Sequence, residues 1–303
     1  MSAAPQKLLL VGAGGFVGPW LARAALAAGW AVTGLSRRAT DIYGTGYIAV
    51  AADATDVVAC RPYVEAADAV IYNAAYIPAN YSDATEAADC LSVNAQAPLA
   101  MLGLLAARPR PFVYISSAQG YVATGRPASE GDAVFPSGRA AYYLASKLLG
   151  DIFTEHYRLV HGVPTAVLRF GSLYGPGLKR GMVAHFVEQA RTGRRITLQN
   201  GGRHQADVTF VGDAGFAMTA VLERRSEGIF NIGSGCATSA LAVAQLVVTA
   251  AGRSSELLDI EPPDKMPDGG GFAALDIARA VRELGYVPTL PAAGLARTFR
   301  EWL

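Results

Sequence analysis

Short apolar runs alternate with longer amphipathic segments through residues 8–169 of the chain. The runs predict strands and the amphipathic segments predict helices. The predicted strands are 8–11, 31–35, 48–51, 69–72, 112–116 and 165–169, and the predicted helices are 17–28, 90–107 and 142–161. Strands and helices in turn are typical of a parallel sheet covered by helices on both faces. We therefore expect an α/β protein in which residues 1–171 form a doubly wound parallel sheet.

The pattern changes after residue 171, where glycine and proline become frequent. Shorter apolar runs predict strands at 196–198, 208–211 and 229–232, with helices between them. We interpret residues 172–303 mostly as a smaller C-terminal lobe that binds the substrate. A segment at about 207–235 is expected to return to the first domain.

Composition excludes several classes of partner. The chain has 303 residues, is 51% hydrophobic and carries a formal net charge of +1, so no strong field attracts nucleic acid or an acidic membrane. No apolar run is long enough to span a bilayer, and the N-terminal run is too short for a secretory signal. Cys60, Cys90 and Cys236 lack the spacing of metal ligands, so we expect reduced thiols and no metal. These features favour a cytoplasmic protein with a small-molecule substrate.

A glycine-rich turn lies between the first predicted strand and the first predicted helix. Its sequence is Gly12-Ala13-Gly14-Gly15-Phe16-Val17-Gly18. Glycines let the backbone approach a pyrophosphate, and a helix N-terminus offers free N–H groups and partial positive charge to it. A glycine-rich turn alone is weak evidence, but strand, turn and helix together predict a dinucleotide site.

The end of the second predicted strand bears on the choice of cofactor. An NAD site usually has an acidic residue there, which binds the ribose 2′-hydroxyl. This chain has Ser36-Arg37-Arg38 instead, and a hydroxyl with two guanidinium groups suits a 2′-phosphate. NADP is therefore favoured and NAD stays possible, because the arginines can also be solvated loop residues.

Further motifs follow in order along the chain. They are Asp53 after the third strand, Asn73-Ala74-Ala75, Val93-Asn94, Ile115-Ser116-Ser117, Tyr143-Leu144-Ala145-Ser146-Lys147, Tyr174-Gly175-Pro176-Gly177 and Asn231-Ile232-Gly233-Ser234-Gly235. With them the chain resembles the extended short-chain dehydrogenase/reductase family, or NAD-dependent epimerase/dehydratase family, over essentially its whole length. The resemblance implies a Rossmann domain and a homodimer built on the helix of Tyr143 and the helix after the fourth strand, with Leu148, Ile152 and Met101 as candidate contacts.

The resemblance also implies a set of cofactor contacts. They are Gly12, Gly15, Phe16, Val17, Gly18, Ser36, Arg37, Arg38, Asp53, Ala54, Asn73, Ala74, Ala75, Asn94, Ser116, Tyr143, Lys147, Phe170 and Ser172. In the family the aspartate corresponding to Asp53 contacts adenine, and the lysine corresponding to Lys147 holds the nicotinamide ribose.

Tyr143, Lys147 and Ser117 are the predicted catalytic residues. Tyr143 and Lys147 are four apart on one helix and so share a face. A free tyrosine has a pKa of about 10, and a nearby ammonium together with an oxidised nicotinamide is expected to lower it toward neutrality. By resemblance, Ser117 hydrogen-bonds the reacting carbonyl or alcohol.

Several reactions remain open at this stage. The family's 4,6-dehydratases carry Thr-Asp-Glu where this chain has Ser117-Ala118-Gln119, so elimination lacks its acid and base. None of the three cysteines lies where the family's epimerase-reductases place theirs. We expect an NADPH-dependent ketoreductase, with an NAD(P)-dependent sugar 4-epimerase as the alternative. A non-catalytic NADP sensor is less favoured, because Tyr143 and Lys147 are both present.

The substrate is less determined than the reaction. Nucleotide-sugar relatives often have Asn at the place of Ser172 and Arg-Asp at the place of Ala206-Asp207. Lys179, Arg180, Arg203 or His204 can supply the missing phosphate contact. The candidate substrate residues are Tyr76, Ala118, Gln119, Ser172, Tyr174, Arg180 and Arg203, and Tyr81 and Tyr121 either border the pocket or pack in the core.

Overall fold

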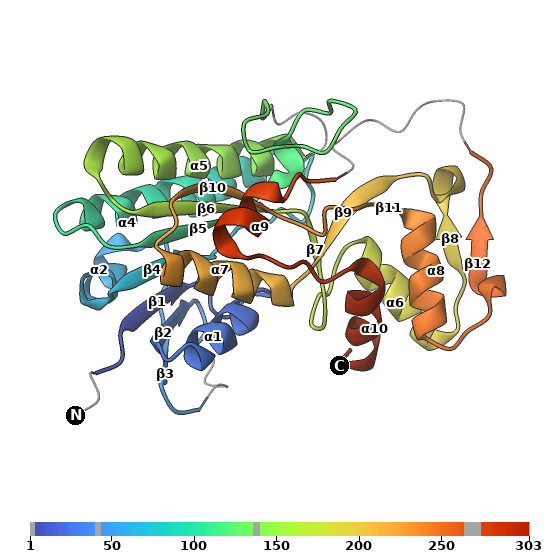
Figure 1. Ribbon diagram of the computed structural model, residues 1–303, viewed down its shortest axis with the longest axis horizontal. Coiled ribbons are helices and arrows are strands. Elements are labelled where there is room, and N and C mark those ends of the chain that lie inside the picture. Colours follow the sequence, from blue (N-terminus) through green and yellow to red (C-terminus); the bar gives the residue numbers. More distant parts are fainter. Residues whose placement is uncertain (1–3, 40–43, 136–139, 264–273, 303) are drawn as a thin grey trace.

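The computed structural model describes residues 4–39, 44–135, 140–263 and 274–302 (Figure 1). Its main feature is a seven-stranded sheet in the order β10-β6-β5-β4-β1-β2-β3, in which every pairing is parallel. The strands are β1 Lys7–Val11, β2 Ala31–Ser36, β3 Tyr47–Ala51, β4 Ala69–Tyr72, β5 Phe112–Ser117, β6 Thr165–Phe170 and β10 Gly228–Ile232. This is the doubly wound Rossmann arrangement that the sequence predicts.

The sheet is buried on both faces, as the apolar runs require. In β1, Leu8 and Leu10 face one core while Leu9 and Val11 face the other, because successive side chains alternate across a strand. The first core is closed by α1 Gly18–Ala27, α7 Gly212–Arg224 and α9 Ala278–Leu284, and the second by α2 Val57–Ala66 and α4 Ala97–Ala106. Helix α5 Ala141–His161 lies with α4 on the second face (Figure 1).

The predicted elements differ from the observed ones in three places. The single helix predicted at 90–107 is α3 Ala87–Leu91, a π-helical turn Ser92–Gln96 and α4 in succession. Helix α2 was not predicted; it carries Pro62 in its interior, which weakens the helical signal. Met101 lies fully buried between α4 and the sheet, so it is not available to the outer face suggested for a dimer.

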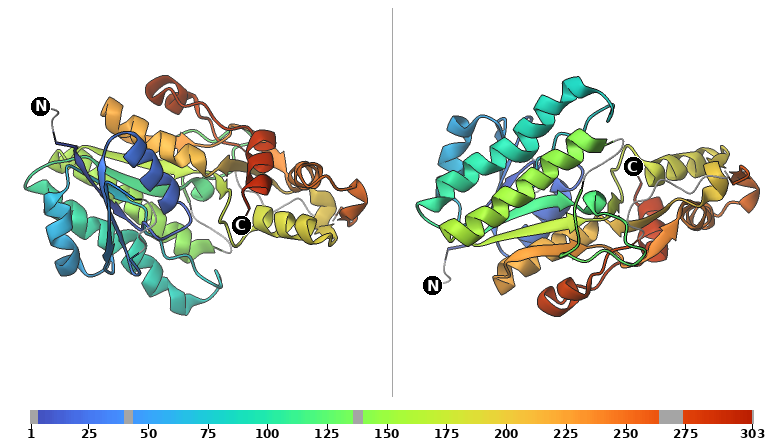
Figure 2. Two further views of the ribbon diagram at one scale, coloured as in Figure 1. Left: turned by 90° about the horizontal axis from the view of Figure 1, so that it is seen from below. Right: turned by 90° about the horizontal axis from the view of Figure 1, so that it is seen from above.

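A second lobe contains β7, β8, β9, β11, β12, α6, α8 and α10 (Figures 1 and 2). Strands β7 Ser172–Tyr174, β9 Gln205–Phe210 and β11 Ala237–Ser239 form one sheet, and β8 Ile196–Leu198 pairs with β12 Leu258–Ile260. Helices α6 Met182–Thr192, α8 Ala240–Ala250 and α10 Pro291–Arg300 share a separate core with these strands. Strand β9 belongs to this lobe, and the chain rejoins the main sheet only with α7 and β10.

Within the described part of the chain, no helix is both long and apolar enough to cross a membrane. The same residues hold no group of three or more His, Cys, Asp or Glu side chains arranged to bind a metal ion.

Candidate functional site

The glycine turn between β1 and α1 is packed directly against the end of β4. Gly12 has φ +88°, and a Cβ there would lie 2.4 Å from the backbone nitrogen of Ala74. The side chain of Asn73 donates a hydrogen bond to the Gly12 carbonyl at 2.9 Å. Glycine is therefore required at position 12 both for its backbone conformation and for the close approach of two strand ends.

The first turn of α1 is open to a ligand. A Cβ at Gly18 would lie 2.2 Å from the carbonyl oxygen of Ala13, whereas Gly14 and Gly15 are exposed. Val17 at the N-cap makes no side-chain cap, but Pro19 has no N–H group and the Trp20 N–H donates to the Val17 carbonyl at 3.0 Å. In this turn the Gly18 N–H is therefore the helix group that can bind an anion. Phe16 and Val17 are half-buried against the core of the second lobe. This turn fits a dinucleotide pyrophosphate.

The ends of β2 and β3 form the adenosine side of the predicted cofactor site. Arg37, Arg38 and Asp53 are exposed there, and Ala54 is buried. Asp53 Oδ1 accepts hydrogen bonds from the Thr55 N–H at 2.9 Å and the Thr55 hydroxyl at 2.7 Å. These bonds, aided by the charge of Arg37, lower the pKa of Asp53.

Ser36 is arranged differently from the expectation. Its hydroxyl donates to the carbonyl of Arg38 at 2.6 Å, within the turn itself. To donate to a 2′-phosphate, that hydroxyl must first give up this bond. Of the three residues Ser36, Arg37 and Arg38, only the two arginines therefore still favour NADP.

The catalytic side chains come from α5 and the end of β5. Lys147 is 3% exposed, and its ammonium donates to the carbonyl of Ile115 at 2.6 Å and lies 4.2 Å from the Tyr114 ring centroid. Burial lowers the pKa of Lys147 to about 7, and the carboxylate of Asp151 opposes that effect. Lys147 is thus held at the end of β5, next to the Ser-Ser pair.

Tyr143 lies one turn before Lys147 and is half-buried. Burial is the main cause that raises its pKa above the ordinary tyrosine value, with smaller contributions from Tyr81 and Cys90. The lowered pKa expected from the sequence is therefore not produced by the residues around it. Ser117 is half-buried, and its oxygen accepts the Gln119 N–H at 3.2 Å, which leaves the hydroxyl proton available for a substrate oxygen.

Asn94 and Phe170 are among the predicted cofactor residues that are buried within the protein. Asn94 is completely buried: its amide donates to the Tyr76 carbonyl and to the Ser146 hydroxyl, and its oxygen accepts the Tyr76 N–H. It therefore clamps the segment after β4 onto α5 and presents no surface to a cofactor. The Phe170 side chain packs in the core beneath the sheet, so only its backbone remains for a ligand.

The remaining predicted cofactor residues lie at the carboxyl ends of the parallel strands. Asn73, Ala74 and Ser172 are half-buried and Ala75 is exposed, whereas Ser116 is buried beside Asp151. Strand ends of a doubly wound sheet meet at one edge, which is where such folds bind their ligands.

Tyr81 connects the catalytic tyrosine to the second lobe. Its ring is edge-on to the Tyr143 ring, with centroids 6.2 Å apart, and the positive charge of Arg180 acts on its hydroxyl. The Tyr76 hydroxyl donates to Glu86 at 3.1 Å, so that side chain is tied into the segment that carries Tyr81. Tyr81 and Arg180 are thus the candidates placed nearest to Tyr143.

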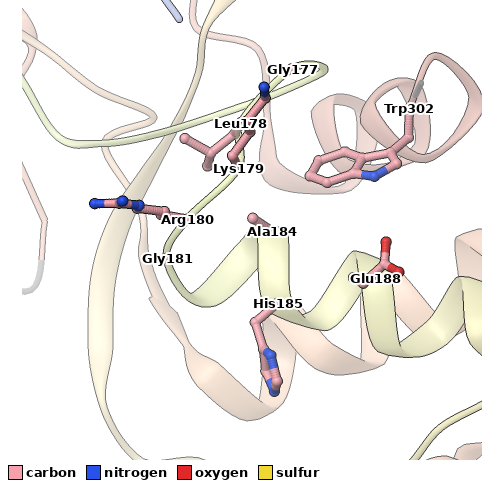
Figure 3. Close-up of a pocket in the computed structure, with 9 residues that line it drawn as sticks. All are labelled: Gly177, Leu178, Lys179, Arg180, Gly181, Ala184, His185, Glu188 and Trp302. Atoms are coloured by element: carbon pink, nitrogen blue, oxygen red, sulfur yellow. The ribbon is translucent and has the colours of Figure 1, made fainter. Parts of the chain in front are cut away.

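A cavity of about 600 Å³ lies around the start of α6 (Figure 3). Its lining residues are Gly177, Leu178, Lys179, Arg180, Gly181, Ala184, His185, Glu188 and Trp302. A second cavity, of about 370 Å³, includes His185, Gln199 and His204. Both belong to the second lobe, and Arg180 of the first cavity is the lining residue whose charge acts on Tyr81.

Other predicted substrate residues are placed differently. Tyr174 is fully buried and packs against Phe210, and Tyr121 is buried with its hydroxyl bonded to Asn231. Ala118 is also buried, whereas Gln119 and Arg203 are exposed. The alternative of core packing is therefore the observed one for both tyrosines.

Sequence reasoning missed a buried ion pair beneath the site. Asp151 and Arg169 are joined at 2.8 Å, and Arg169 also donates to the Tyr121 hydroxyl at 2.8 Å. The sequence feature that could have revealed Asp151 is its spacing of four residues from Lys147, which places a carboxylate on the same face of α5 as the predicted catalytic residues.

The chain is similar to known proteins over most of its length. The model of the NAD dependent epimerase/dehydratase family matches residues 8–233. A UDP-glucose 4-epimerase of Mycolicibacterium smegmatis is 29% identical over 316 aligned residues, which cover 97% of each chain. A dTDP-L-rhamnose 4-epimerase of Burkholderia thailandensis is 30% identical over 154 residues, or 48% of this chain and 41% of that protein. For the first relatives of this kind, the match spans only about half of their length.

Solved structures show the same fold. A UDP-glucuronic acid 4-epimerase from Bacillus cereus, solved with UDP-glucuronic acid and NAD, superposes with a TM-score of 0.84 at 21% identity and covers 98% of both chains. At this level of identity the likeness establishes the architecture and leaves the substrate open.

Proposed function

The chain belongs to the NAD dependent epimerase/dehydratase family, and we propose that within it the protein is a nucleotide-sugar 4-epimerase. The observation that carries this proposal is the full-length similarity to a UDP-glucose 4-epimerase, 29% identical with 97% of each chain aligned. It moves epimerisation, the alternative at the sequence level, ahead of ketone reduction. Ala118 and Gln119 argue against the dehydratases of the family, because neither side chain can serve as an acid or base.

The proposed cofactor is NAD, held by the glycine turn, by Asp53 on the adenosine side and by Lys147 near the nicotinamide ribose. The support from this chain is the close contact of Gly12 with Ala74, the uncapped first turn of α1 and the exposed Asp53 carboxylate. When bound, the nicotinamide supplies a reversible hydride acceptor.

The protein's own residues would move the proton. Tyr143 as the phenolate accepts the proton of the sugar C4 hydroxyl, and as the phenol returns it to the C4 oxygen after the keto sugar has turned. Ser117 donates a hydrogen bond to the C4 oxygen and keeps it in place in both directions. Burial opposes the phenolate of Tyr143, so the Lys147 ammonium must favour it electrostatically.

Ketone reduction with NADPH is the second candidate. Arg37 and Arg38 favour it, because both are exposed where a 2′-phosphate would lie and no acidic residue follows β2 directly. A cofactor that carries this phosphate is reduced in cells and exchanges at each turnover, which suits a reductase.

We also propose that the protein is a homodimer. Helix α5 exposes Tyr142, Ile152 and Leu159 on its outer side, and Ile152 is 51% and Leu159 70% exposed. A two-fold contact would cover this apolar side. Sedimentation of the wild type and of Ile152→Lys tests it: a dimer that the variant converts to a folded monomer supports the proposal, and a monomeric wild type contradicts it.

One experiment separates the two reactions. The purified protein is denatured to release any nucleotide, and fresh protein is incubated with UDP-glucose or UDP-galactose without added cofactor. An epimerase retains NAD and converts each sugar to the other, whereas Tyr143→Phe does not. A protein without bound NAD that instead oxidises NADPH in the presence of a nucleotide-linked keto sugar would establish the reductase.

A further inference from the structure

Three charged side chains lie buried together beneath the catalytic site. Lys147 and Asp151 are each 3% exposed and Arg169 is 5% exposed. Lys147 and Asp151 are one turn apart on α5, and Arg169 reaches the carboxylate of Asp151 from β6 with Nε at 2.8 Å. A buried charge is unfavourable unless it is paired, so the charges of this cluster depend on one another.

We propose that Asp151 is a positioning residue that keeps Lys147 protonated. In this proposal Arg169 sets how far the Asp151 carboxylate is ionised, and therefore how much negative charge acts on Lys147. The inference rests on the role of Lys147 in the proposed function. It adds two residues that touch neither substrate nor cofactor but adjust the ionisation of one that does.

The surroundings of Lys147 leave Asp151 as its anionic neighbour. From β5 it faces the Tyr114 ring and the Ile115 carbonyl, which are uncharged. From its own helix it faces Tyr143 and Asp151. Burial lowers the pKa of Lys147, and the charge of Asp151 is what raises it.

Asp151 is itself shared between two cations. Burial raises its pKa, whereas the charges of Arg169 and Lys147 and the neighbouring Ser116 hydroxyl lower it. Arg169 stays protonated at any ordinary pH, and its direct bond to the carboxylate keeps Asp151 ionised. The guanidinium therefore maintains the negative charge on which Lys147 depends.

The net charge of the cluster favours ionisation of Tyr143. Two cations and one anion leave a net charge of +1 beside a neutral Tyr143, and the cluster with Tyr143 becomes neutral when the phenol ionises. Without Asp151 the same site would hold two unpaired cations, and Lys147 would lose its proton first because a lysine deprotonates more readily than an arginine.

The proposal predicts shifts in the same direction for two substitutions. Asp151→Asn should lower the pKa of Lys147 and move the alkaline limb of kcat/KM to lower pH by about one unit or more, a typical effect of a close opposite charge. Arg169→Gln should also move the limb to lower pH, because buried Asp151 then loses the cation that keeps it ionised. Glu155→Gln is the matched control: Glu155 lies on the same helix and pairs with Arg158 at 2.9 Å, so no shift is expected.

The titration of Lys147 is also measured directly, by NMR of the protein with isotope-labelled lysine, with Lys147→Arg used to assign the signal. A structural role alone would lower stability or kcat equally at every pH and leave the Lys147 titration unchanged in both variants, which overturns the proposal. If Asp151→Asn does not fold, Arg169→Gln and Asp151→Glu still decide: the first must lower the Lys147 pKa, and the second must keep it near the wild-type value.

The two proposals fail in different ways. A lowered Lys147 pKa in both variants without epimerase activity would support the charge cluster and reject the proposed reaction. Epimerase activity with an unchanged Lys147 pKa in the variants would support the proposed reaction and reject the charge cluster.

Discussion

The main sheet and the second lobe each contain a buried carboxylate, but the partners of the two carboxylates differ. In the lobe, Asp207 is completely buried and accepts four hydrogen bonds, from the N–H and hydroxyl of Ser234 and from the N–H groups of Gly235 and Leu275. All its partners are neutral and most belong to the backbone. Beneath the main sheet, Asp151 is instead placed between two cations, Arg169 and Lys147.

The comparison shows that a buried carboxylate can have two roles: Asp207 fixes the position of neighbouring segments, and Asp151 affects the ionisation of neighbouring groups. Only neutral donors contact Asp207 in the described residues, and these bonds tie the segment after β10 and residue 275 to β9. Two cations around Asp151 make the ionisation of each group depend on the others. The buried charge in the lobe therefore supports the architecture, whereas for the buried charge beneath the main sheet we propose a role in the chemistry.

The largest expected effect is on the catalytic side of this comparison. Tyr143→Phe should lower kcat by about a thousandfold, within the range of general acid–base catalysis, because no other group is placed to move the proton. Thermal unfolding and NAD binding should stay close to the wild type. Tyr142→Phe is the control, since Tyr142 is the next residue on α5 and is 38% exposed. Equal losses in the two variants would contradict the assignment.

A stability effect is expected on the lobe side. Asp207→Asn should lower the free energy of unfolding by roughly 2–3 kcal/mol, because the new amide group presents donors to N–H groups that need an acceptor. Denaturant titration measures the change, and Asp259→Asn on exposed β12 should change it little. The folded Asp207→Asn protein should keep the alkaline limb of the wild type. A shifted limb would mean that the lobe also tunes the site.

The smallest predicted effect is the difference between two glycines of similar conformation. Gly12 has φ +88° and a Cβ there meets Ala74, whereas Gly29 has φ +85° and a Cβ there meets nothing within 4 Å. Gly29→Ala should cost about 1 kcal/mol for its backbone alone. Gly12→Ala should cost more and also weaken NAD binding, measured by denaturant titration and calorimetry. Equal costs with unchanged binding would show that the close approach at position 12 has no function.

Much of the main sheet was readable from the residues. The apolar runs predicted all seven of its strands within one or two residues, because a strand covered on both faces must be apolar throughout. Helix α2 escaped this reasoning because Pro62 interrupts its pattern, and the π-helical turn before α4 has no local signature.

The candidate site was predictable in part. Glycine spacing and the four-residue step from Tyr143 to Lys147 are local features, so the sequence predicts a cofactor turn and a catalytic helix, and both stay predictions. Burial and pairing are set by segments far apart in the chain, and no local pattern shows them. The tertiary structure therefore decided that Tyr174 and Asn94 are enclosed by the protein.

The sequence by itself determined the fold class and predicts the dinucleotide turn and the pair Tyr143 and Lys147, because each has a pattern that is visible within a few residues. The charge around the catalytic lysine was decided only by the tertiary structure. Asp151 reaches Arg169 across 18 positions and Lys147 reaches the Ile115 carbonyl across 32, and such contacts exist only after β5, β6 and α5 have packed together.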